Sequence, residues 1–193
     1  SWPAYRLAYR AGRAPPLPFG RDGGVFIITD NVRADHTSLC GFPEATTPAL
    51  VALAEEPGAV HTCRAYAPGS WTLPSHASYF TGRPVVEHLA HEYDKQVDDP
   101  SGSAIPSRGL GGEFETLAEA FRDRGYQTVL LSGNPVVGRK MGLSQGFQHV
   151  QVAERFGEMD DEAVRPGLAR VLRDQLSPEG GPLFLTVNLA EAH

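Results

Sequence analysis

The sequence predicts an α/β protein with a doubly wound, mostly parallel sheet flanked by helices. Short runs rich in β-branched residues alternate with amphipathic segments, which is the order of parallel strands joined by helical crossovers. Residues 24–29 form a continuous apolar, β-branched run, and residues 126–131 form a second run of the type found in strands that are buried on both faces of a sheet. Polar residues follow both runs, where such sheets bind ligands.

The amino-terminal elements can be placed in order. Residues 1–23 carry interleaved arginines and prolines without a period, so we expect an irregular extension before a domain that spans residues 24–193. Residues 24–29 form the first strand. Thr47 and Pro48 have the pattern of an N-cap and first helical residue, which predicts a helix to Glu56 with Leu50 and Leu53 facing inward.

The middle of the chain contains the junction of greatest chemical interest. Residues 60–67 alternate well enough to predict a strand. Residues 68–70 then turn the chain into a short helix that starts near Thr72 and ends near Gly82. Residues 92–112 are rich in Gly, Pro and Ser, which predicts a long surface loop.

The remaining elements continue the alternation of strands and helices. Residues 116–124 predict an amphipathic helix and residues 126–131 a buried strand. Residues 147–152 predict a weaker strand, and the apolar positions between 164 and 176 predict a helix. Residues 183–189 return to the sheet, with four residues after them, which suggests a sheet that is incomplete at its carboxyl-terminal side.

Composition excludes several classes of function. Lys and Arg number 17 against 23 Asp and Glu, so a net charge of −6 gives no general attraction for nucleic acid or anionic lipid. No apolar run approaches the ~20 residues of a membrane helix, so we expect no membrane span. Cys40 and Cys63 lack C-x-x-C spacing and are too few for a disulfide framework, which leaves the compartment open, an extracytoplasmic one included.

Parallel strand ends should bring the polar candidates to one rim of the sheet. We expect Asp30, Asn31, Thr72, Asn134 and His193 to converge there. Asp30 and Asn31 offer hard oxygen ligands for a divalent cation, although residues of these types also form turns after strands.

Thr72 would lie at a helix amino terminus, where free N–H groups and the helix dipole favour negative charge. His76 follows one turn later and could donate to an anion bound at Thr72. The alternatives are a plain helix cap at Thr72, a packing histidine at position 76 and a turn at Asn134.

Several stretches occur together in one order. They are Ile27-Ile-Thr-Asp-Asn-Val-Arg-Ala-Asp-His36, Thr46-Thr-Pro-Ala-Leu50, Tyr66-Ala-Pro-Gly-Ser-Trp-Thr-Leu-Pro-Ser-His-Ala-Ser78, Thr81-Gly82, Ser132-Gly-Asn-Pro135 and Gly142-Leu-Ser-Gln-Gly-Phe147. In these stretches the chain resembles the sulfatase branch of the alkaline phosphatase superfamily. The resemblance implies an alkaline-phosphatase-like fold.

The resemblance also implies roles for individual residues. Asp30 and Asn31 become metal ligands, and Thr72 occupies the nucleophile position and contributes to the metal site. His76 stands where the sulfatase motif C-x-P-S-R has its arginine. Asn134 and His193 become substrate-binding residues, and the implied cofactor is a divalent metal, Ca²⁺ first, with Mg²⁺, Mn²⁺ or Zn²⁺ as alternatives.

Threonine in place of the cysteine that sulfatases oxidise to formylglycine resembles the nucleophile of phosphodiesterases and phosphoryl transferases in the same superfamily. The expected function is therefore hydrolysis or transfer of a small phosphate or sulfate ester. Catalytic domains in this family are much longer, so we expect a missing carboxyl-terminal segment or a second chain to complete the site. The alternatives are a catalytically inactive, anion-binding relative and an interaction module that engages a partner through residues 1–23.

Overall fold

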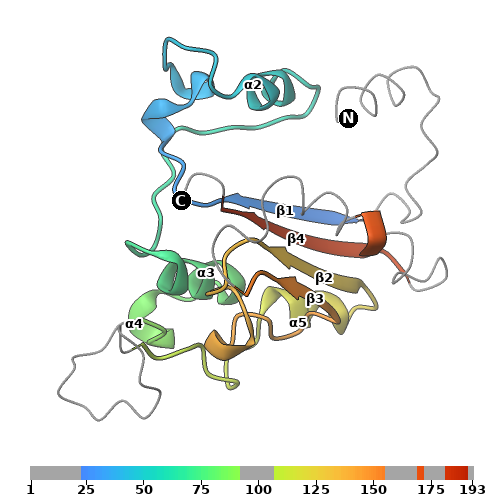
Figure 1. The fold of residues 1–193 in the computed structure, drawn as a ribbon. Helices are drawn as coiled ribbons and strands as arrows, with labels where there is room; N and C mark the ends of the chain where they lie inside the picture. Colours follow the sequence, from blue (N-terminus) through green and yellow to red (C-terminus); the bar gives the residue numbers. More distant parts are fainter. Residues whose placement is uncertain (1–22, 92–106, 155–168, 172–180, 191–193) are drawn as a thin grey trace.

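A computed structural model describes residues 23–91, 107–154, 169–171 and 181–190. Its centre is a sheet of four parallel strands in the order β1-β4-β2-β3 (Figure 1). The strands are β1 (Gly24–Thr29), β2 (Gln127–Ser132), β3 (His149–Val152) and β4 (Leu183–Leu189). The last strand is therefore inserted between the first two, so the ends of β1, β4 and β2 lie side by side.

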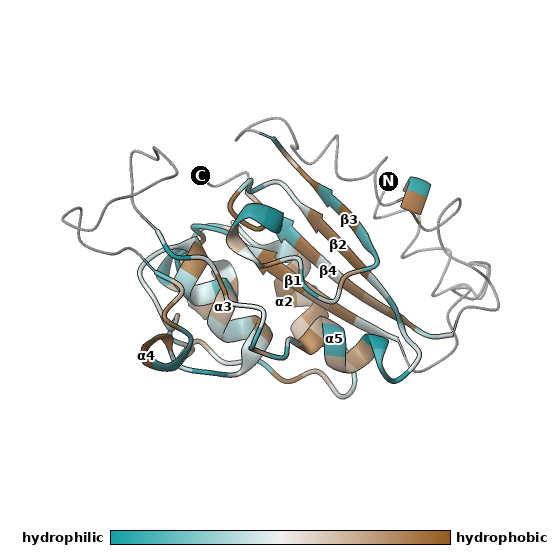
Figure 2. Cartoon of the chain, turned by 90° about the horizontal axis from the view of Figure 1, so that it is seen from below, coloured by the Kyte–Doolittle hydropathy of each residue, from teal (hydrophilic) through white to brown (hydrophobic). Residues whose placement is uncertain are grey.

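One face of the sheet is covered by two helices, α3 (Thr72–Thr81) and α5 (Leu117–Arg122). Leu73, Ala77 and Phe80 of α3 pack with Leu130 of β2 in a buried cluster. The short helix α4 (Val85–His88) follows α3. Figure 2 shows hydrophobic colours along β2 and β4, as expected for strands that pack on both faces.

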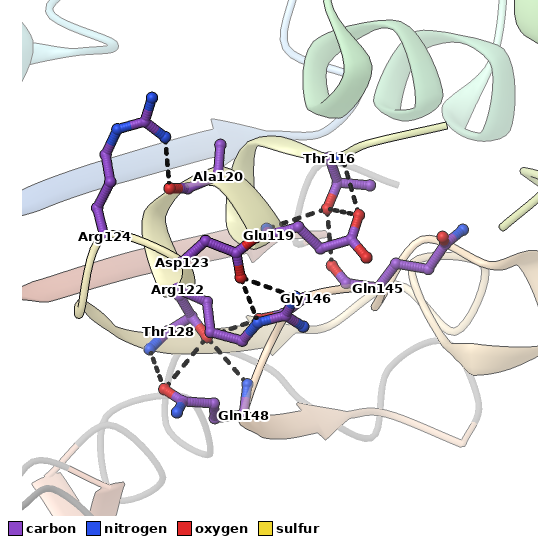
Figure 3. Close-up of polar contacts among 10 residues, drawn as sticks. All are labelled: Thr116, Glu119, Ala120, Arg122, Asp123, Arg124, Thr128, Gln145, Gly146 and Gln148. Atoms are coloured by element: carbon purple, nitrogen blue, oxygen red, sulfur yellow. Dashed lines mark hydrogen bonds and ion pairs between the residues drawn. The ribbon is translucent and has the colours of Figure 1, made fainter. Parts of the chain in front are cut away.

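The amino terminus of α5 is fixed by a complete capping box (Figure 3). The Thr116 hydroxyl accepts a hydrogen bond from the backbone N–H of Glu119, whose carboxylate accepts one from the Thr116 N–H at 2.8 Å. In the same region the Thr128 hydroxyl donates to the carbonyl of Gly146 at 2.8 Å. The first two bonds fix the start of α5, and the third attaches the loop before β3 to β2.

The opposite face of the sheet carries a second group of apolar side chains. Val129, Leu131, Leu185 and Val187 pack there with Val171 in a second buried cluster. On the neighbouring strand β1, Val25 is 63% exposed and Ile27 is 54% exposed. They lie in register with Leu185 and Val187, so the apolar surface of this face continues onto β1.

Residues 31–70 leave the sheet and return to it at α3 (Figure 1). They contain the 3₁₀ turns η1 (Ala34–His36) and η2 (Ser38–Cys40) and the helix α2 (Pro48–Ala54). α2 buries none of its residues, so the prediction that Leu50 and Leu53 face a core is wrong. The predicted strand at 60–67 is also wrong, because this stretch lies outside the sheet and forms no ladder.

A disulfide between Cys40 and Cys63 joins the two arms of this segment. The sequence did not predict this disulfide, because the spacing of the two cysteines does not show that the chain folds back and brings them together. No described helix is long and apolar enough to cross a membrane.

The strands predicted at 24–29 and 183–189 are confirmed, and those at 126–131 and 147–152 are confirmed with small shifts of their ends. The helices at Thr72 and at residues 116–124 are confirmed as α3 and α5. The extension at 1–22, most of the loop at 92–112 and most of the helix between 164 and 176 lie outside the described residues.

Candidate active site

Three chain segments meet at the carboxyl ends of the central strands. Asp30 directly follows β1, and its N–H donates to the carbonyl of Leu189 on β4 at 2.8 Å. Asn134 follows β2 by two residues. Thr72 is the first residue of α3, which packs beneath these strand ends. The structure therefore brings Asp30, Thr72 and Asn134 together at this rim, as predicted.

The three side chains form a compact triangle. The Thr72 hydroxyl donates to Oδ2 of Asp30 at 3.3 Å. Nδ2 of Asn134 donates to the same Oδ2 at 2.6 Å and to Oγ1 of Thr72 at 3.0 Å. Thr72 is only 8% exposed and Asn134 is fully buried, whereas Asp30 is partly exposed. The hydroxyl is thus held between a carboxylate and an amide.

The orientation of the Asn134 amide is fixed by the backbone. Oδ1 accepts a hydrogen bond from the N–H of Val136 at 2.9 Å, which requires that atom to be the oxygen. Both hydrogens of Nδ2 then face Asp30 and Thr72. We expected Asn134 to contact substrate, but in this conformation its donors are already engaged with Asp30 and Thr72.

Local sequence explains why the helix starts at Thr72. Trp71 is extended and serves as the N-cap, and Pro74 lies in the first turn, where its missing N–H costs no helical hydrogen bond. Gly69 approaches so closely that a Cβ there would lie 2.7 Å from Cγ of Pro74. Ser75 donates to the Gly69 carbonyl at 3.0 Å, which fixes the turn that precedes the helix.

His76 is placed differently from our expectation. Its Nδ1 lies 2.9 Å from the carbonyl of Thr72, and its Nε2 lies 3.1 Å from Nδ2 of Asn188. The ring is 2% exposed and packs against Tyr79 and Phe80. Both ring nitrogens are therefore hydrogen bonded within the protein, and neither is directed at an anion beside the Thr72 hydroxyl.

Asn188 of β4 and Ser132 of β2 complete the site, and the sequence reasoning gave neither a role. They are register partners in the sheet, and the Ser132 hydroxyl lies 3.1 Å from Oδ1 of Asn188 and accepts from the Asn134 N–H at 3.0 Å. Both residues are fully buried. An asparagine inside an otherwise apolar strand was the signal that could have identified Asn188.

The other candidates are less integrated. Asn31 is exposed and adopts a left-handed backbone with φ of 58°, which asparagine tolerates better than most residues. His193 lies outside the described residues. Arg33 and Asp35 form an exposed ion pair at 2.7 Å.

Burial controls the ionisation of the groups around Thr72. It lowers the pKa of His76 from its ordinary value, and the Thr72 carbonyl and the Asp30 charge oppose this only in part, so the ring is neutral near pH 7. Burial and then the Asp30 charge raise the pKa of the Tyr79 hydroxyl.

The oxygens present suit a hard divalent cation. Asp30 Oδ2 and Thr72 Oγ1 lie 3.3 Å apart, and Oδ1 of Asp30 has no hydrogen-bond partner among the residues that the structure describes. Ca²⁺ takes ~6–8 oxygen ligands and Mg²⁺ also prefers oxygen. Across the described ranges there is no group of three or more His, Cys, Asp or Glu that could hold a metal, so these residues fit one part of a coordination shell.

Comparison with known families matches residues 24–193 to the family described as Sulfatase. The chain belongs to the sulfatase family. This match covers the strand ends, Thr72 and the sheet, and it places the chain in the alkaline phosphatase superfamily. The comparison with curated proteins finds no match.

Solved structures share the fold of this sulfatase-family chain. BT4656 in complex with its substrate D-glucosamine-2-N,6-O-disulfate has 17% identity and a TM-score of 0.67. A phosphonate monoester hydrolase of Agrobacterium radiobacter has 20% identity and a TM-score of 0.63. The C-terminal periplasmic domain of EcEptC from Escherichia coli, in complex with Zn, has 19% identity and a TM-score of 0.53.

These alignments cover most of this chain and a minor part of each neighbour. They cover 89%, 90% and 88% of this chain, but only 34%, 41% and 43% of the respective neighbours. At these identities the likeness establishes the fold, and it confirms the predicted parallel α/β class.

Proposed function

We propose that this chain contributes the nucleophile and part of the metal site of a metal-dependent hydrolase or transferase that acts on small phosphate or sulfate esters. The observation that carries the proposal is the position of the Thr72 hydroxyl. It lies at the amino terminus of α3 and is hydrogen bonded to the Asp30 carboxylate. A hydroxyl so placed has both a proton acceptor and a positive helix end beside it.

The chemistry of Thr72 follows from its neighbours. Oγ1 attacks phosphorus or sulfur, forming a Thr72 ester while the bond to the leaving alcohol breaks. The hydroxyl proton passes along the existing hydrogen bond to Asp30, and the leaving alkoxide takes a proton from water. Water or an acceptor alcohol then attacks the Thr72 ester, and Oγ1 leaves and takes its proton back from Asp30. The proton of the attacking water or alcohol neutralises the hydroxide that the first step left. The N–H groups of Thr72 and Leu73 lack helical partners and can donate to the nonbridging oxygens of the ester group.

The metal would be held by Asp30, Asn31 and Thr72, with further ligands from outside the described residues. When bound, a divalent ion supplies charge that stabilises an alkoxide and the developing negative charge on the ester. Ca²⁺ is our first choice, with Mg²⁺, Mn²⁺ and Zn²⁺ as alternatives. Two observations support a divalent metal at this site: the oxygen-rich donor set, and the zinc complex formed by one structural neighbour.

Phosphate esters are the favoured substrates within this proposal. Threonine cannot follow the cysteine route to formylglycine that the sulfatase resemblance implies for sulfate esters, whereas it can form a phosphothreonine ester directly. The neighbours support both classes, since one is a phosphonate monoester hydrolase and another binds a sulfated glucosamine.

The test uses the full-length protein that carries these residues. Hydrolysis of bis(4-nitrophenyl) phosphate and of 4-nitrophenyl sulfate is measured with each metal and after chelation. We expect turnover of the phosphate diester, its loss on chelation, and a decrease of at least about 100-fold in kcat for Thr72→Val. Thr72→Ser, which keeps the hydroxyl, should retain most of the activity.

Mass spectrometry of the acid-quenched reaction with bis(4-nitrophenyl) phosphate should find a 4-nitrophenyl phosphoryl group on Thr72 in the wild-type protein and no such group in Thr72→Val. Undiminished turnover by Thr72→Val would contradict the nucleophile role. Binding of inorganic phosphate without turnover of either ester would favour the second candidate, an inactive anion-binding relative. This second candidate is supported by one observation: the polar side-chain atoms of His76 and Asn134 form hydrogen bonds within the protein.

A further inference from the structure

We infer that Asn188 is a positioning residue, which fixes the His76 ring and through it the first turn of α3 that carries Thr72. The inference deepens the proposed function and rests on it for its catalytic consequence. It starts from the hydrogen-bond pattern of the buried ring. The carbonyl of Thr72 can only accept, so Nδ1 of His76 carries the proton. Nε2 of the neutral ring must then accept, and Nδ2 of Asn188 is its donor at 3.1 Å.

The amide of Asn188 is itself oriented by the sheet. Its Oδ1 faces the hydroxyl of Ser132, the register partner on β2, at 3.1 Å. The Ser132 hydroxyl also donates to the carbonyl of Asn134 at 3.0 Å and accepts a hydrogen bond from the Asn134 N–H. Because Oδ1 faces a donor, Nδ2 must face His76. The Nε2 lone pair that this tautomer leaves is thus satisfied by a strand residue that is far from His76 in sequence.

These bonds close a ring around the nucleophile position. From Thr72 the contacts run through His76, Asn188, Ser132 and Asn134, and the Asn134 amide returns to Oγ1 of Thr72 at 3.0 Å. Every member is at most 8% exposed. Such a ring holds Thr72 by its backbone carbonyl on one side and by its hydroxyl on the other. Loss of one donor leaves buried partners unsatisfied, so the remaining members must rearrange.

The chain supplies a matched control on the same helix. Ser78 lies in α3, is as buried as Thr72, and its hydroxyl lies 2.9 Å from Nε2 of the buried His88. This second histidine pair is outside the ring. A variant such as Ser78→Ala therefore removes a buried hydrogen bond from α3 without touching the contacts of Thr72.

The experiment compares Asn188→Leu and Ser78→Ala with the wild type in the full-length protein. Asn188→Ala serves if Asn188→Leu does not fold. Spectra of ¹⁵N-histidine report the His76 tautomer, and ¹³C-methyl threonine spectra report the surroundings of Thr72. We expect the Asn188 variants to shift the Nε2 resonance of His76, which loses its hydrogen-bond donor, and to shift the Thr72 methyl signal, whereas Ser78→Ala keeps both.

Kinetics with bis(4-nitrophenyl) phosphate supply the catalytic arm. We expect kcat to fall by about 10- to 100-fold in the Asn188 variants with KM changed less than about twofold, because orientation of the nucleophile and not binding is lost. Ser78→Ala should keep the wild-type kcat. In a double-mutant cycle, Asn188→Ala should add little to the kcat loss of His76→Ala.

The outcomes separate this inference from the proposed function. If the wild-type protein hydrolyses neither ester, the proposed function fails, and the spectra alone decide the positioning role. Wild-type His76 and Thr72 signals in a folded Asn188 variant overturn the inference. Equal loss of kcat in Ser78→Ala and Asn188→Leu also overturns it, because that result describes general helix stability.

Discussion

The region around α3 and the segment of residues 31–70 are adjacent in sequence but are stabilised by different interactions. α3 buries Leu73, Ala77 and Phe80 against the sheet, whereas α2 buries none of its residues. The segment is held by the Cys40–Cys63 disulfide and by hydroxyl contacts such as that of Ser38 with Thr47 at 3.1 Å. The position of Thr72 therefore depends on packing, and the shape of the preceding segment depends on a covalent link.

The largest expected effect is a difference in the free energy of unfolding between two leucine-to-alanine variants. Leu73→Ala removes a fully buried side chain from α3 and should lower the free energy of unfolding by roughly 3–5 kcal/mol. Leu53→Ala on α2, where the side chain is 60% exposed, should change it by at most about 0.5 kcal/mol. Urea unfolding of both variants measures the difference, and similar values would remove the contrast between the regions.

Removing the disulfide should affect mainly the segment. For a link across 23 residues, Cys40→Ser with Cys63→Ser should cost about 3 kcal/mol in the chain-entropy model. We expect faster hydrogen exchange at residues 34–66 and unchanged exchange in β2 and β4. Comparable acceleration in the strands would show that the disulfide stabilises the whole fold.

The capping box of α5 provides an intermediate effect within the packed region. Thr116→Ala removes the hydroxyl that accepts from Glu119 and contacts the carbonyl of Gln145, and it should cost about 1–2 kcal/mol. Thr116→Ser keeps the hydroxyl and serves as control. A thermal or urea unfolding experiment in which both variants match the wild type would show that the box contributes nothing.

The smallest effect concerns pH. Burial, and next the charge of His91, lower the pKa of the folded His88 below 6.5. The unfolded chain therefore takes up this proton first, so the contribution of His88 is present above about pH 6.5 and is lost as the pH falls below it. The loss of stability between pH 7.5 and 5.5 should be smaller in His88→Asn, which retains an acceptor for the Ala90 N–H. An equal loss in both proteins would contradict this assignment.

Much of the sheet could be predicted because strands leave a local signature. The apolar runs at 24–29 and 183–189 match β1 and β4 to the residue, and the turn before Thr72 is encoded in adjacent residues. The segment at 60–67 has a similar alternation but no strand beside it. An alternating pattern shows which side chains could be buried. A strand forms only where a neighbouring strand supplies the backbone hydrogen bonds.

The residues of the site could be predicted better than the hydrogen bonds between them. Strand ends placed Asp30, Thr72 and Asn134 together, because parallel strands share one edge. The direction of His76 could not be predicted, since it depends on Asn188, a residue more than a hundred positions away. For the same reason the disulfide was missed, because it joins two arms of a segment that has no regular pattern.

The exposed apolar residues of β1 have a practical consequence for handling the protein. Among the described residues β1 pairs only with β4, so its outer edge offers free N–H and C=O groups next to Val25 and Ile27. An edge strand with this composition is a template for adding strands from other copies. We therefore expect Ile27→Lys to lower self-association through this edge.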